Sequence, residues 1–205
     1  MKSLCLIVLA AGRSRRFGDE NKLLAALPSP DRATASLLEA SLTRFPPALF
    51  QRRILVVGPG DHDVAEIGRR RGFEIAVNSA PEAGMGRSIA IGVGARPDCD
   101  GAMIALGDMP FVKPSTVKAL AASFIESTGE MAIAPVFNQR RGHPVIFPRA
   151  CFDALRRLDG DAGARRLFSA NDGAALLALP VDDPGVLQDI DTPDDIAGLK
   201  RPGEM

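Results

Sequence analysis

The chain has 205 residues, of which 46% are hydrophobic, and its 25 lysines and arginines balance its 25 aspartates and glutamates. A chain of roughly 100 to 250 residues with this apolar content is typical of one domain, here residues 1–205, around one core. The balanced charge argues against a nucleic-acid partner or a membrane surface. No apolar stretch approaches the roughly 20 residues of a membrane span.

The three cysteines, Cys5, Cys99 and Cys151, show no CxxC or Cys/His spacing, and the two histidines stand alone. We interpret all three cysteines as structural free thiols of a protein in the reducing cytoplasm. The apolar run at 4–9 is too short for a signal peptide and leads directly into a loop. We therefore expect a cytoplasmic protein, a monomer or a weak dimer, without a zinc site.

Apolar, β-branched runs alternate with helical periodicity along the first half of the chain. The expected elements are a strand at 3–9, a helix at about 34–45, a strand at 53–57, a helix at 62–71, a strand at 74–77, a helix at 87–95 and a strand at 101–106. This alternation is typical of a Rossmann-like, doubly wound α/β fold with a mostly parallel sheet.

The second half of the chain has a less regular pattern. The expected elements are a helix at about 114–126, strands at 131–135 and 143–147, helices at 149–158 and 161–170, a strand at 175–180 and a short helix from Pro193. The Pro/Ser/Ala/Thr-rich segment 28–36 predicts a mobile loop close in sequence to Lys22. No repeat or long linker divides the chain.

The most informative segment is Leu9-Ala10-Ala11-Gly12-Arg13-Ser14-Arg15-Arg16-Phe17-Gly18, with Lys22 soon after it. The apolar run at 4–9 predicts a buried parallel strand, so this loop leaves the carboxyl end of a strand, where α/β sheets bind ligands. Its backbone amides and cations suit a polyanion such as a triphosphate. The alternative is a tight turn with solvated arginines.

Two carboxylate motifs indicate a metal site. Asp108 follows the strand expected at 101–106, beside the first loop, and Mg²⁺ beside a triphosphate takes one or two protein carboxylates plus phosphate oxygens. Asp189 and Asp191 are two positions apart, so they face the same way in an extended segment. One would complete the metal site, and the other would cap the following helix or face solvent. Asp108 has the alternative role of a helix cap.

The loop 78–89 has two glycines and opens a helix. Its amides and the Ser88 hydroxyl can reach a base edge or a ribose, with Asn78 facing the base from the end of its strand. Ordinary turn glycines and capping by Ser88 are the alternative.

The first loop resembles the N-terminal signature of the nucleotidyltransferases that include the molybdenum cofactor cytidylyltransferases and guanylyltransferases. Further segments resemble that family in the same order: Gly-Met-Gly-x-Ser-Ile at 84–89, Gly-Asp-Met-Pro at 107–110, Gly-His-Pro-Val at 142–145, Gly-Asp-x-Gly-Ala-Arg at 160–165 and Asp-Ile-Asp-Thr-Pro at 189–193. The chain departs from the pattern in having three residues between Gly18 and Lys22, and in lacking Gly-x-Pro-Leu after Lys-Leu-Leu.

The resemblance implies a nucleotide-diphospho-sugar transferase fold of the GT-A-like type and a site made of four groups of residues. The implied nucleotide-binding residues are Leu9, Ala10, Ala11, Gly12, Arg13, Ser14, Lys22, Asn78, Gly84, Gly86, Ser88, Gly107 and Asp108. The implied catalytic residues are Lys22, Arg16 and Asp108. The implied ligands of Mg²⁺, or of Mn²⁺ in its place, are Asp108 and Asp191, with Asp189 as the substitute for Asp191. Arg140, Arg141 and His143 lie where the acceptor enters in the family, although arginines are also common on hairpin surfaces.

The implied reaction is attack by an acceptor phosphate on the α-phosphate of a nucleoside triphosphate, with release of pyrophosphate. The cytidylyltransferase branch is resembled by three segments together, which implies CTP as donor and a molybdopterin-type acceptor: Ala10-Ala11-Gly12, Gly84-Met85-Gly86 and Gly142-His143-Pro144. The alternatives are a guanylyltransferase, a sugar-phosphate or polyol-phosphate nucleotidyltransferase, and a cofactor carrier without turnover. Such a carrier would deliver the molybdenum cofactor to a molybdenum hydroxylase or its chaperone. The absence of GxGxxG followed by an acidic residue about 20 positions later argues against an NAD-dependent oxidoreductase.

Overall fold

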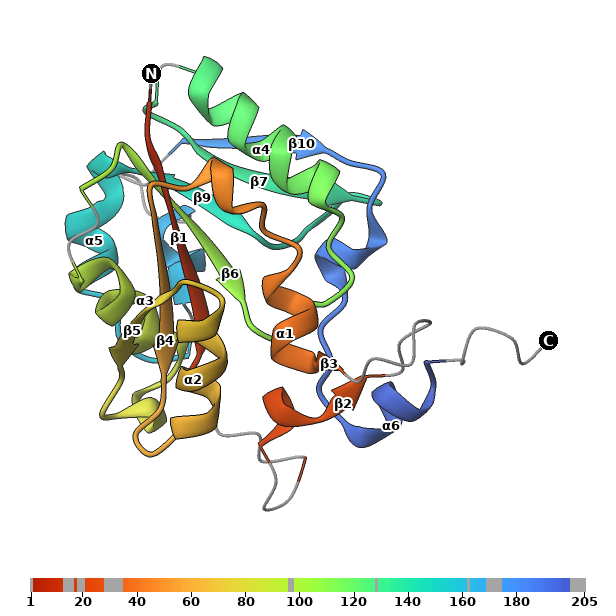
Figure 1. Cartoon of the computed structure of the whole chain (residues 1–205). Helices are drawn as coiled ribbons and strands as arrows, with labels where there is room; N and C mark the ends of the chain where they lie inside the picture. The colour runs from red at the N-terminus through yellow and green to blue at the C-terminus, as the bar shows by residue number, and fades with distance from the viewer. Residues whose placement is uncertain are drawn as a thin grey trace.

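The computed structural model describes residues 2–12, 17, 21–27, 35–95, 98–127, 129–161, 163–168 and 175–199. Its main-sheet strands are β1 (Leu4–Ala10), β4 (Arg52–Val57), β5 (Glu74–Val77), β6 (Gly101–Leu106), β7 (Ala132–Phe137), β8 (Arg140–Arg141), β9 (Val145–Pro148) and β10 (Leu176–Pro180). They lie in the order β10-β7-β9-β6-β1-β4-β5, with β8 beside β7 (Figure 1). Two further strands, β2 (Ala26–Leu27) and β3 (Ala35–Ser36), form a small antiparallel sheet.

Strand β1 lies at the centre of the sheet, parallel to β4 on one side and to β6 on the other. All seven of its residues are buried. Alternate residues enter opposite core clusters, with Leu6 and Val8 on one face and Cys5 and Ile7 on the other. The unbroken apolar run is therefore explained by cover on both faces of the sheet.

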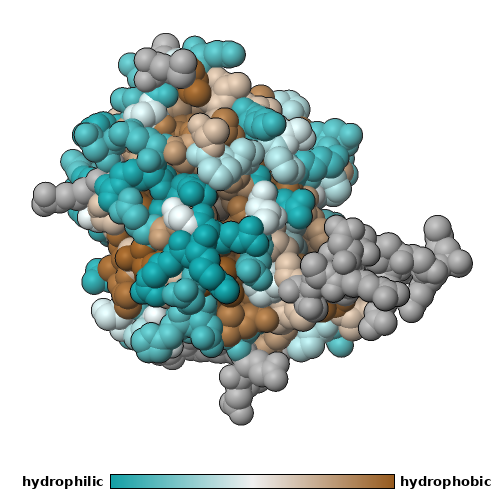
Figure 2. All heavy atoms as spheres, in the orientation of Figure 1, coloured by the Kyte–Doolittle hydropathy of each residue, from teal (hydrophilic) through white to brown (hydrophobic). Residues whose placement is uncertain are grey.

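The helices that supply this cover are α1 (Leu37–Leu42), α2 (His62–Arg70), α3 (Met85–Gly94), α4 (Pro114–Glu126) and α5 (Phe152–Arg156). Helices α1, α2 and α4 pack on one face, and α3 and α5 pack on the other (Figure 1). The outward side of α2 is charged, which Figure 2 shows as a hydrophilic area over that helix. This two-faced arrangement confirms the predicted doubly wound α/β fold with a mostly parallel sheet.

The elements of the first half lie within a few residues of their predicted bounds, apart from the expected helix at 34–45. That segment forms β3 and the shorter α1, because Ser36 caps the helix and its side chain accepts a hydrogen bond from the Glu39 backbone. The loop predicted at 28–36 lies outside the described residues, except for the two that form β3. Strand β9, predicted to begin at 143, begins at Val145 and runs antiparallel to β6 and β7.

Two helices predicted in the second half are shorter than expected. Residues 149–158 form a 3-10 turn, Arg149–Cys151, followed by α5, which ends at Arg156. Among the described residues of 161–170, the structure has a 3-10 helix, Gly163–Phe168, whose first residue Gly163 is left-handed with φ of +53°, as is Gly160 before it with φ of +76°. A left-handed residue cannot belong to a right-handed α-helix, so Gly163 prevents a continuous α-helix from running through this segment.

The fold brings the ends of β1 and β6 together. Leu9 pairs with Leu106, and the Gly107 amide donates a hydrogen bond of 2.9 Å to the Leu9 carbonyl. The carboxyl-terminal segment joins them, because the Ile190 amide donates to the Asp108 carbonyl at 3.0 Å. The three cysteines are buried and free, as predicted. No helix in the described part of the chain is long and apolar enough to cross a membrane.

Candidate functional site

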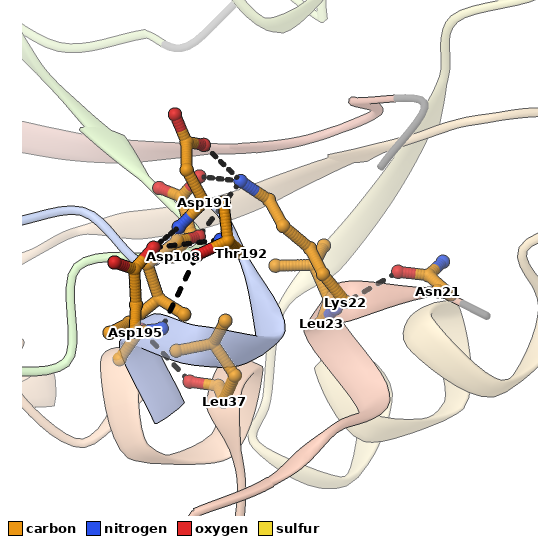
Figure 3. A network of polar contacts seen from close by, with 10 residues as sticks. Asn21, Lys22, Leu23, Leu37, Asp108, Asp191, Thr192 and Asp195 are labelled. Carbon is orange, nitrogen blue, oxygen red and sulfur yellow. Dashed lines mark hydrogen bonds and ion pairs between the residues drawn. The ribbon is translucent and has the colours of Figure 1, made fainter. Parts of the chain in front are cut away.

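Three side chains from distant segments meet at the carboxyl ends of β1 and β6 (Figure 3). The Lys22 ammonium lies 2.7 Å from Asp108 Oδ2 and 2.9 Å from Asp191 Oδ1. It also donates a hydrogen bond of 3.0 Å to the Ile190 carbonyl. The Lys22 and Asp108 side chains are only 12% and 17% exposed, so this cation and carboxylate face each other largely shielded from water.

Lys22 is placed by the 3-10 helix η2 (Lys22–Leu24). The Asn21 side-chain oxygen caps this turn by accepting a hydrogen bond from the Leu23 amide at 3.0 Å. The Asn21 amide in turn donates to Asp61 Oδ1 at 3.2 Å, which ties the turn to the start of α2. The lysine backbone is therefore anchored on both sides, and its long side chain reaches back to the end of β6.

Asp191 is placed by the cap of helix α6 (Pro193–Ala197). The Asp191 and Thr192 amides donate to Asp195 Oδ2 at 2.9 Å and 2.7 Å, and the Thr192 side chain accepts from the Asp195 amide (Figure 3). This reciprocal capping box fixes the entry to the helix. Asp189, two positions earlier, lines the same pocket as Asp191, as expected for an extended segment.

The electrostatics of the cluster follow from burial and proximity. Burial by itself lowers the pKa of Lys22, but the attraction of the Asp108 and Asp191 carboxylates outweighs it, so that pKa lies above its ordinary value. Burial raises the pKa of Asp108 above the ordinary carboxyl value against the opposing effect of Lys22, and Asp189 adds to the rise. The lysine therefore stays charged and favours the anionic form of Asp108.

The cluster has donor groups that fit a hard divalent cation. Asp108 Oδ1 is buried and has no hydrogen-bond partner among the described residues. Such an atom is costly to leave unsatisfied, and a carboxylate oxygen is the ligand that Mg²⁺ and Mn²⁺ favour. No group of three or more His, Cys, Asp or Glu side chains suited to a metal occurs in the described part. Asp108 and Asp191 would thus hold an ion that takes its other ligands from phosphate and water.

A pocket of about 600 Å³ opens over this cluster. The predicted site residues that line it are Leu9, Ala10, Ala11, Gly12, Lys22, Gly84, Ser88, Asp108 and Asp191. The predicted residues Arg13, Ser14 and Arg16 lie outside the described part of the chain. Gly107, also a predicted nucleotide-binding residue, is buried and does not line this pocket. A Cβ added to it would lie 3.1 Å from the Leu9 carbonyl oxygen.

Asn78 does not line this pocket, although the sequence suggested contact with a base. Its side chain is fully buried, donates to Ser88 Oγ at 3.0 Å and accepts from the Ala80 amide at 3.0 Å. Asn78 therefore orients the Ser88 hydroxyl, which does line the pocket. Spacing alone gave no sign of this indirect role.

The two glycines of the loop 84–86 have a packing role. An added Cβ would lie 2.5 Å from the Gly160 carbonyl carbon at Gly84, and 2.9 Å from the Gly160 oxygen at Gly86. The Gly86 amide donates to the Gly160 carbonyl at 2.9 Å, and the Gly160 amide donates to the Ala83 carbonyl at 2.8 Å. Two motifs that are distant in the sequence therefore form one double loop beside the pocket.

A second chamber, of about 530 Å³, adjoins the first and shares Leu9, Met85 and Asp161 with it. Two of the three predicted acceptor residues, Arg141 and His143, line this chamber, whereas Arg140 does not. Its aromatic lining, Phe147 and Phe168, was not predicted, because Phe147 matched a core strand and Phe168 fell within an expected helix.

Another residue missed by the sequence analysis is Asp183, which is 1% exposed. Its carboxylate accepts hydrogen bonds from the Lys113 amide, the Thr116 hydroxyl and the Gly185 amide at 2.8, 2.7 and 3.0 Å. These contacts fasten the segment leading to Asp191 onto the start of α4. The turn sequence Asp-Pro-Gly was the available signal.

The family comparison agrees with this geometry. Residues 6–186 match the MobA-like NTP transferase domain. The chain belongs to the MobA-like NTP transferase family. The matched range includes Lys22 and Asp108 but stops before Asp191.

Two relatives extend the comparison. The chain is 32% identical over 205 residues to purine catabolism protein PucB of Bacillus subtilis, with 95% of each protein covered. It is 32% identical over 167 residues to a molybdenum cofactor guanylyltransferase of Mesorhizobium japonicum, with 78% of this chain and 74% of that protein covered.

Solved structures share the fold. A homologue of Mycobacterium tuberculosis Rv0371c from Mycobacterium sp. strain JC1 superposes with a TM-score of 0.78 at 28% identity, covering 94% of this chain and 92% of that chain. Rv0371c of strain H37Rv, solved as a complex with manganese, gives a TM-score of 0.71 at 28% identity, covering 94% and 95%. The fold is of the nucleotide-diphospho-sugar transferase type, and this MobA-like chain is a nucleotidyltransferase.

Proposed function

We propose that the chain transfers CMP from CTP to the phosphate of molybdenum cofactor and releases pyrophosphate. The observation that carries this proposal is the Lys22–Asp108–Asp191 cluster under a pocket walled by Ala10, Ala11 and Gly12. Small residues at the end of β1 let a flat base and a ribose lie against the main chain. A cation flanked by two carboxylates suits a triphosphate with a divalent ion.

In the proposed reaction, an oxygen of the acceptor phosphate attacks the α-phosphorus of CTP in line with the leaving group. A bond forms between that oxygen and the α-phosphorus, and the bond from the α-phosphorus to the pyrophosphate oxygen breaks. The acceptor phosphate is already anionic near neutral pH, so no histidine base is needed. Catalysis then rests on positioning and on neutralising charge.

The residues of the chain divide this task. Lys22 stays protonated and offsets the negative charge that grows on the reacting phosphate. Arg16 would act with it. Ser88, oriented by Asn78, offers a hydroxyl to the ribose or the base. Asp108 and Asp191 would hold Mg²⁺, or Mn²⁺ in its place, which would supply positive charge to neutralise the phosphates.

GTP is the second candidate donor, because the relative from Mesorhizobium japonicum is a guanylyltransferase. The methyl group of Ala11 favours CTP. Ala11 is 5% exposed and lines the pocket, and we propose that its methyl narrows the space available to a purine base. We further propose that residues 1–205 form one domain, act in the cytoplasm and pass the product to a molybdenum hydroxylase or its chaperone.

The test is an assay of pyrophosphate release with CTP, GTP, ATP and UTP, each offered with molybdenum cofactor or with sugar and polyol phosphates. Release that requires CTP, molybdenum cofactor and a divalent ion supports the proposal. Release with a sugar or polyol phosphate alone contradicts the acceptor. Tight cofactor binding without release under any combination identifies a carrier.

A further inference from the structure

Lys22 reaches its three partners from a short turn, so the orientation of that turn decides where the ammonium lies. The turn is η2, and Leu23 anchors it, with 4% exposure, in the core cluster that also contains Val64 of α2. Burial of an apolar side chain stabilises a contact without fixing a direction. The orientation of the turn, and with it the path of the Lys22 side chain, must therefore be set by hydrogen bonds.

Those hydrogen bonds come from Asn21, which uses both ends of its side-chain amide. Its oxygen accepts from the Leu23 amide at 3.0 Å (Figure 3), and its nitrogen donates to Asp61 Oδ1 at 3.2 Å. The first bond orients Asn21 on the turn, and the second joins the turn to another part of the fold. The position of Asp61 is thus transmitted to the residue next to Asn21, which is Lys22.

Asp61 is held in turn by the end of β4. Its Oδ2 accepts a hydrogen bond of 3.0 Å from the amide of Gly58, the first residue after that strand. A Cβ added at Gly58 would lie 2.6 Å from the same oxygen, so the close approach depends on a glycine. Strand β4 pairs with the central strand β1. One carboxylate therefore connects the turn that carries Lys22 to the central part of the sheet.

The ordinary role of Asp61 would be to cap its own helix. It occupies the N-cap position of α2, and its carbonyl accepts the hydrogen bond of the Ala65 amide at 3.0 Å. An N-cap aspartate commonly turns its carboxylate to the amides of the first turn, yet the Asp61 side chain makes no such bond in this described turn. Its two oxygens accept from Gly58 and Asn21 instead. The Asp61 side chain therefore supports the turn of Lys22 and not the start of α2.

We propose that Asp61 and Asn21 are positioning residues for the transfer reaction, which set the place of the Lys22 ammonium by fixing its turn to the end of β4. The inference rests on the proposed role of Lys22 toward the reacting phosphate. A shift of the turn moves the ammonium relative to Asp108 and Asp191, and a displacement of about 1 Å is enough to slow a reaction that depends on alignment. Neither positioning residue lines the nucleotide pocket. Their loss should therefore lower kcat and leave the KM for the nucleotide nearly unchanged.

The first test exchanges the two residues. Asn21→Asp places two carboxylates face to face, and Asp61→Asn leaves one of the bonds to Leu23, Asn21 and Gly58 without a matching donor or acceptor. Each single variant is expected to lower kcat about three- to tenfold. In the double variant, the amide at position 61 donates to the carboxylate at position 21, and the bonds from the Leu23 and Gly58 amides are kept. The double variant should recover kcat to within about twofold of wild type.

A second test asks whether Asp61 acts through Lys22. In the Lys22→Ala background, Asp61→Asn should change the residual kcat by less than about twofold, because the effects of coupled residues do not add. The matched control Asp63→Asn, exposed on α2, should leave kcat within about twofold of wild type. Pyrophosphate release with the donor and acceptor that support turnover measures each rate. A full further loss in the Lys22→Ala background would overturn the proposal, as would a double variant as slow as the single variants.

Labelling with acetic anhydride reports on Lys22 without turnover. The ion-paired, 12% exposed ammonium should react slowly in the wild type, at least about twofold faster in each single variant and slowly again in the double variant. The exposed Lys118 is the internal reference for mass spectrometry. Equal Lys22 rates in all variants would overturn the proposal.

The two readouts also separate the inference from the proposed function. If labelling follows the expected pattern but no triphosphate gives pyrophosphate, the proposed function fails and the positioning of Lys22 by Asp61 and Asn21 stands. If release is normal in both single variants, the positioning role fails and the proposed function stands.

Discussion

Lys22 and Asp191 are 169 residues apart in the sequence, yet they form an ion pair of 2.9 Å at the end of the central strand. Asp108 completes the contact from the other side of the ammonium, at 2.7 Å. One cation thus holds together the loop after β6 and the carboxyl-terminal segment. The same cation is suited to meet the phosphates of a nucleotide, so its removal should affect chemistry more than binding.

We expect Lys22→Ala to lower kcat by roughly 10² to 10³, the effect of losing one preorganised charge donor. Its effect on the KM for CTP should be much smaller. The matched control is Lys118→Ala, since Lys118 is exposed on α4 and lies outside both pockets. Steady-state kinetics with pyrophosphate detection measure both parameters. A change confined to KM would make Lys22 a binding residue.

The two carboxylates should differ in their effects on metal dependence. Asp108→Asn is expected to nearly abolish turnover, because it alters the buried carboxylate whose Oδ1 has no partner among the described residues. Asp191→Asn should lower activity and raise the Mn²⁺ concentration needed for half-maximal rate, with Asp189 partly replacing it. Asp194→Asn, at an exposed position of α6, is the control.

Mn²⁺ binding followed by electron paramagnetic resonance checks the same assignment without turnover. Weaker binding in the Asp108 and Asp191 variants, but not in the Asp194 variant, is the expected result. Unchanged Mn²⁺ affinity and unchanged turnover in both site variants would remove these residues from the metal site.

The sequence predicted the central strands well because burial on both faces leaves a continuous apolar run, as in β1 and β6. The rule that parallel strands end at one edge placed Asp108 beside the loop that leads to Lys22, and the family resemblance added Asp191 to the same hypothesis. The sequence could not place Asn78, whose burial depends on packing against Ser88 across ten positions.

The chamber was harder to foresee. Phe147 and Phe168 lie far apart in the sequence and meet only when β9 and the turn Gly163–Phe168 pack together. The helix predicted at 161–170 was wrong in type because helical spacing does not show a left-handed Gly160 or Gly163. Such backbone choices are set by tertiary contacts, here the packing of Gly160 on the loop 84–86.

The packing of the loop 84–86 on Gly160 requires a glycine at position 84, which can be tested. Its φ is +90°, and an added Cβ would lie 2.5 Å from the Gly160 carbonyl carbon. Gly84→Ala should therefore destabilise the fold by about 1 to 3 kcal/mol and raise the KM for the nucleotide. Gly94→Ala is the opposite case, because it lies in α3 with nothing within 4 Å of its added Cβ. It should raise stability by about 0.5 to 1 kcal/mol. Urea unfolding of both variants gives the comparison, and equal stabilities would show that the double loop tolerates a side chain.

The choice of base is the remaining prediction, and it concerns Ala11. Cytosine and guanine differ in size, and Ala11 lines the nucleotide pocket, where we expect its methyl to crowd a purine more than a pyrimidine. We expect wild-type protein to prefer CTP over GTP in competition at equal concentrations. Ala11→Gly should relax that preference by about 1 kcal/mol, the scale on which a pocket discriminates one methylene. The matched control is Ala40→Gly in α1, which packs on the face of the sheet opposite to Ala11. This control should lower the stability of the fold but leave the preference for CTP over GTP unchanged. Wild-type preference for GTP would contradict the cytidylyltransferase assignment and leave nucleotidyl transfer itself in place.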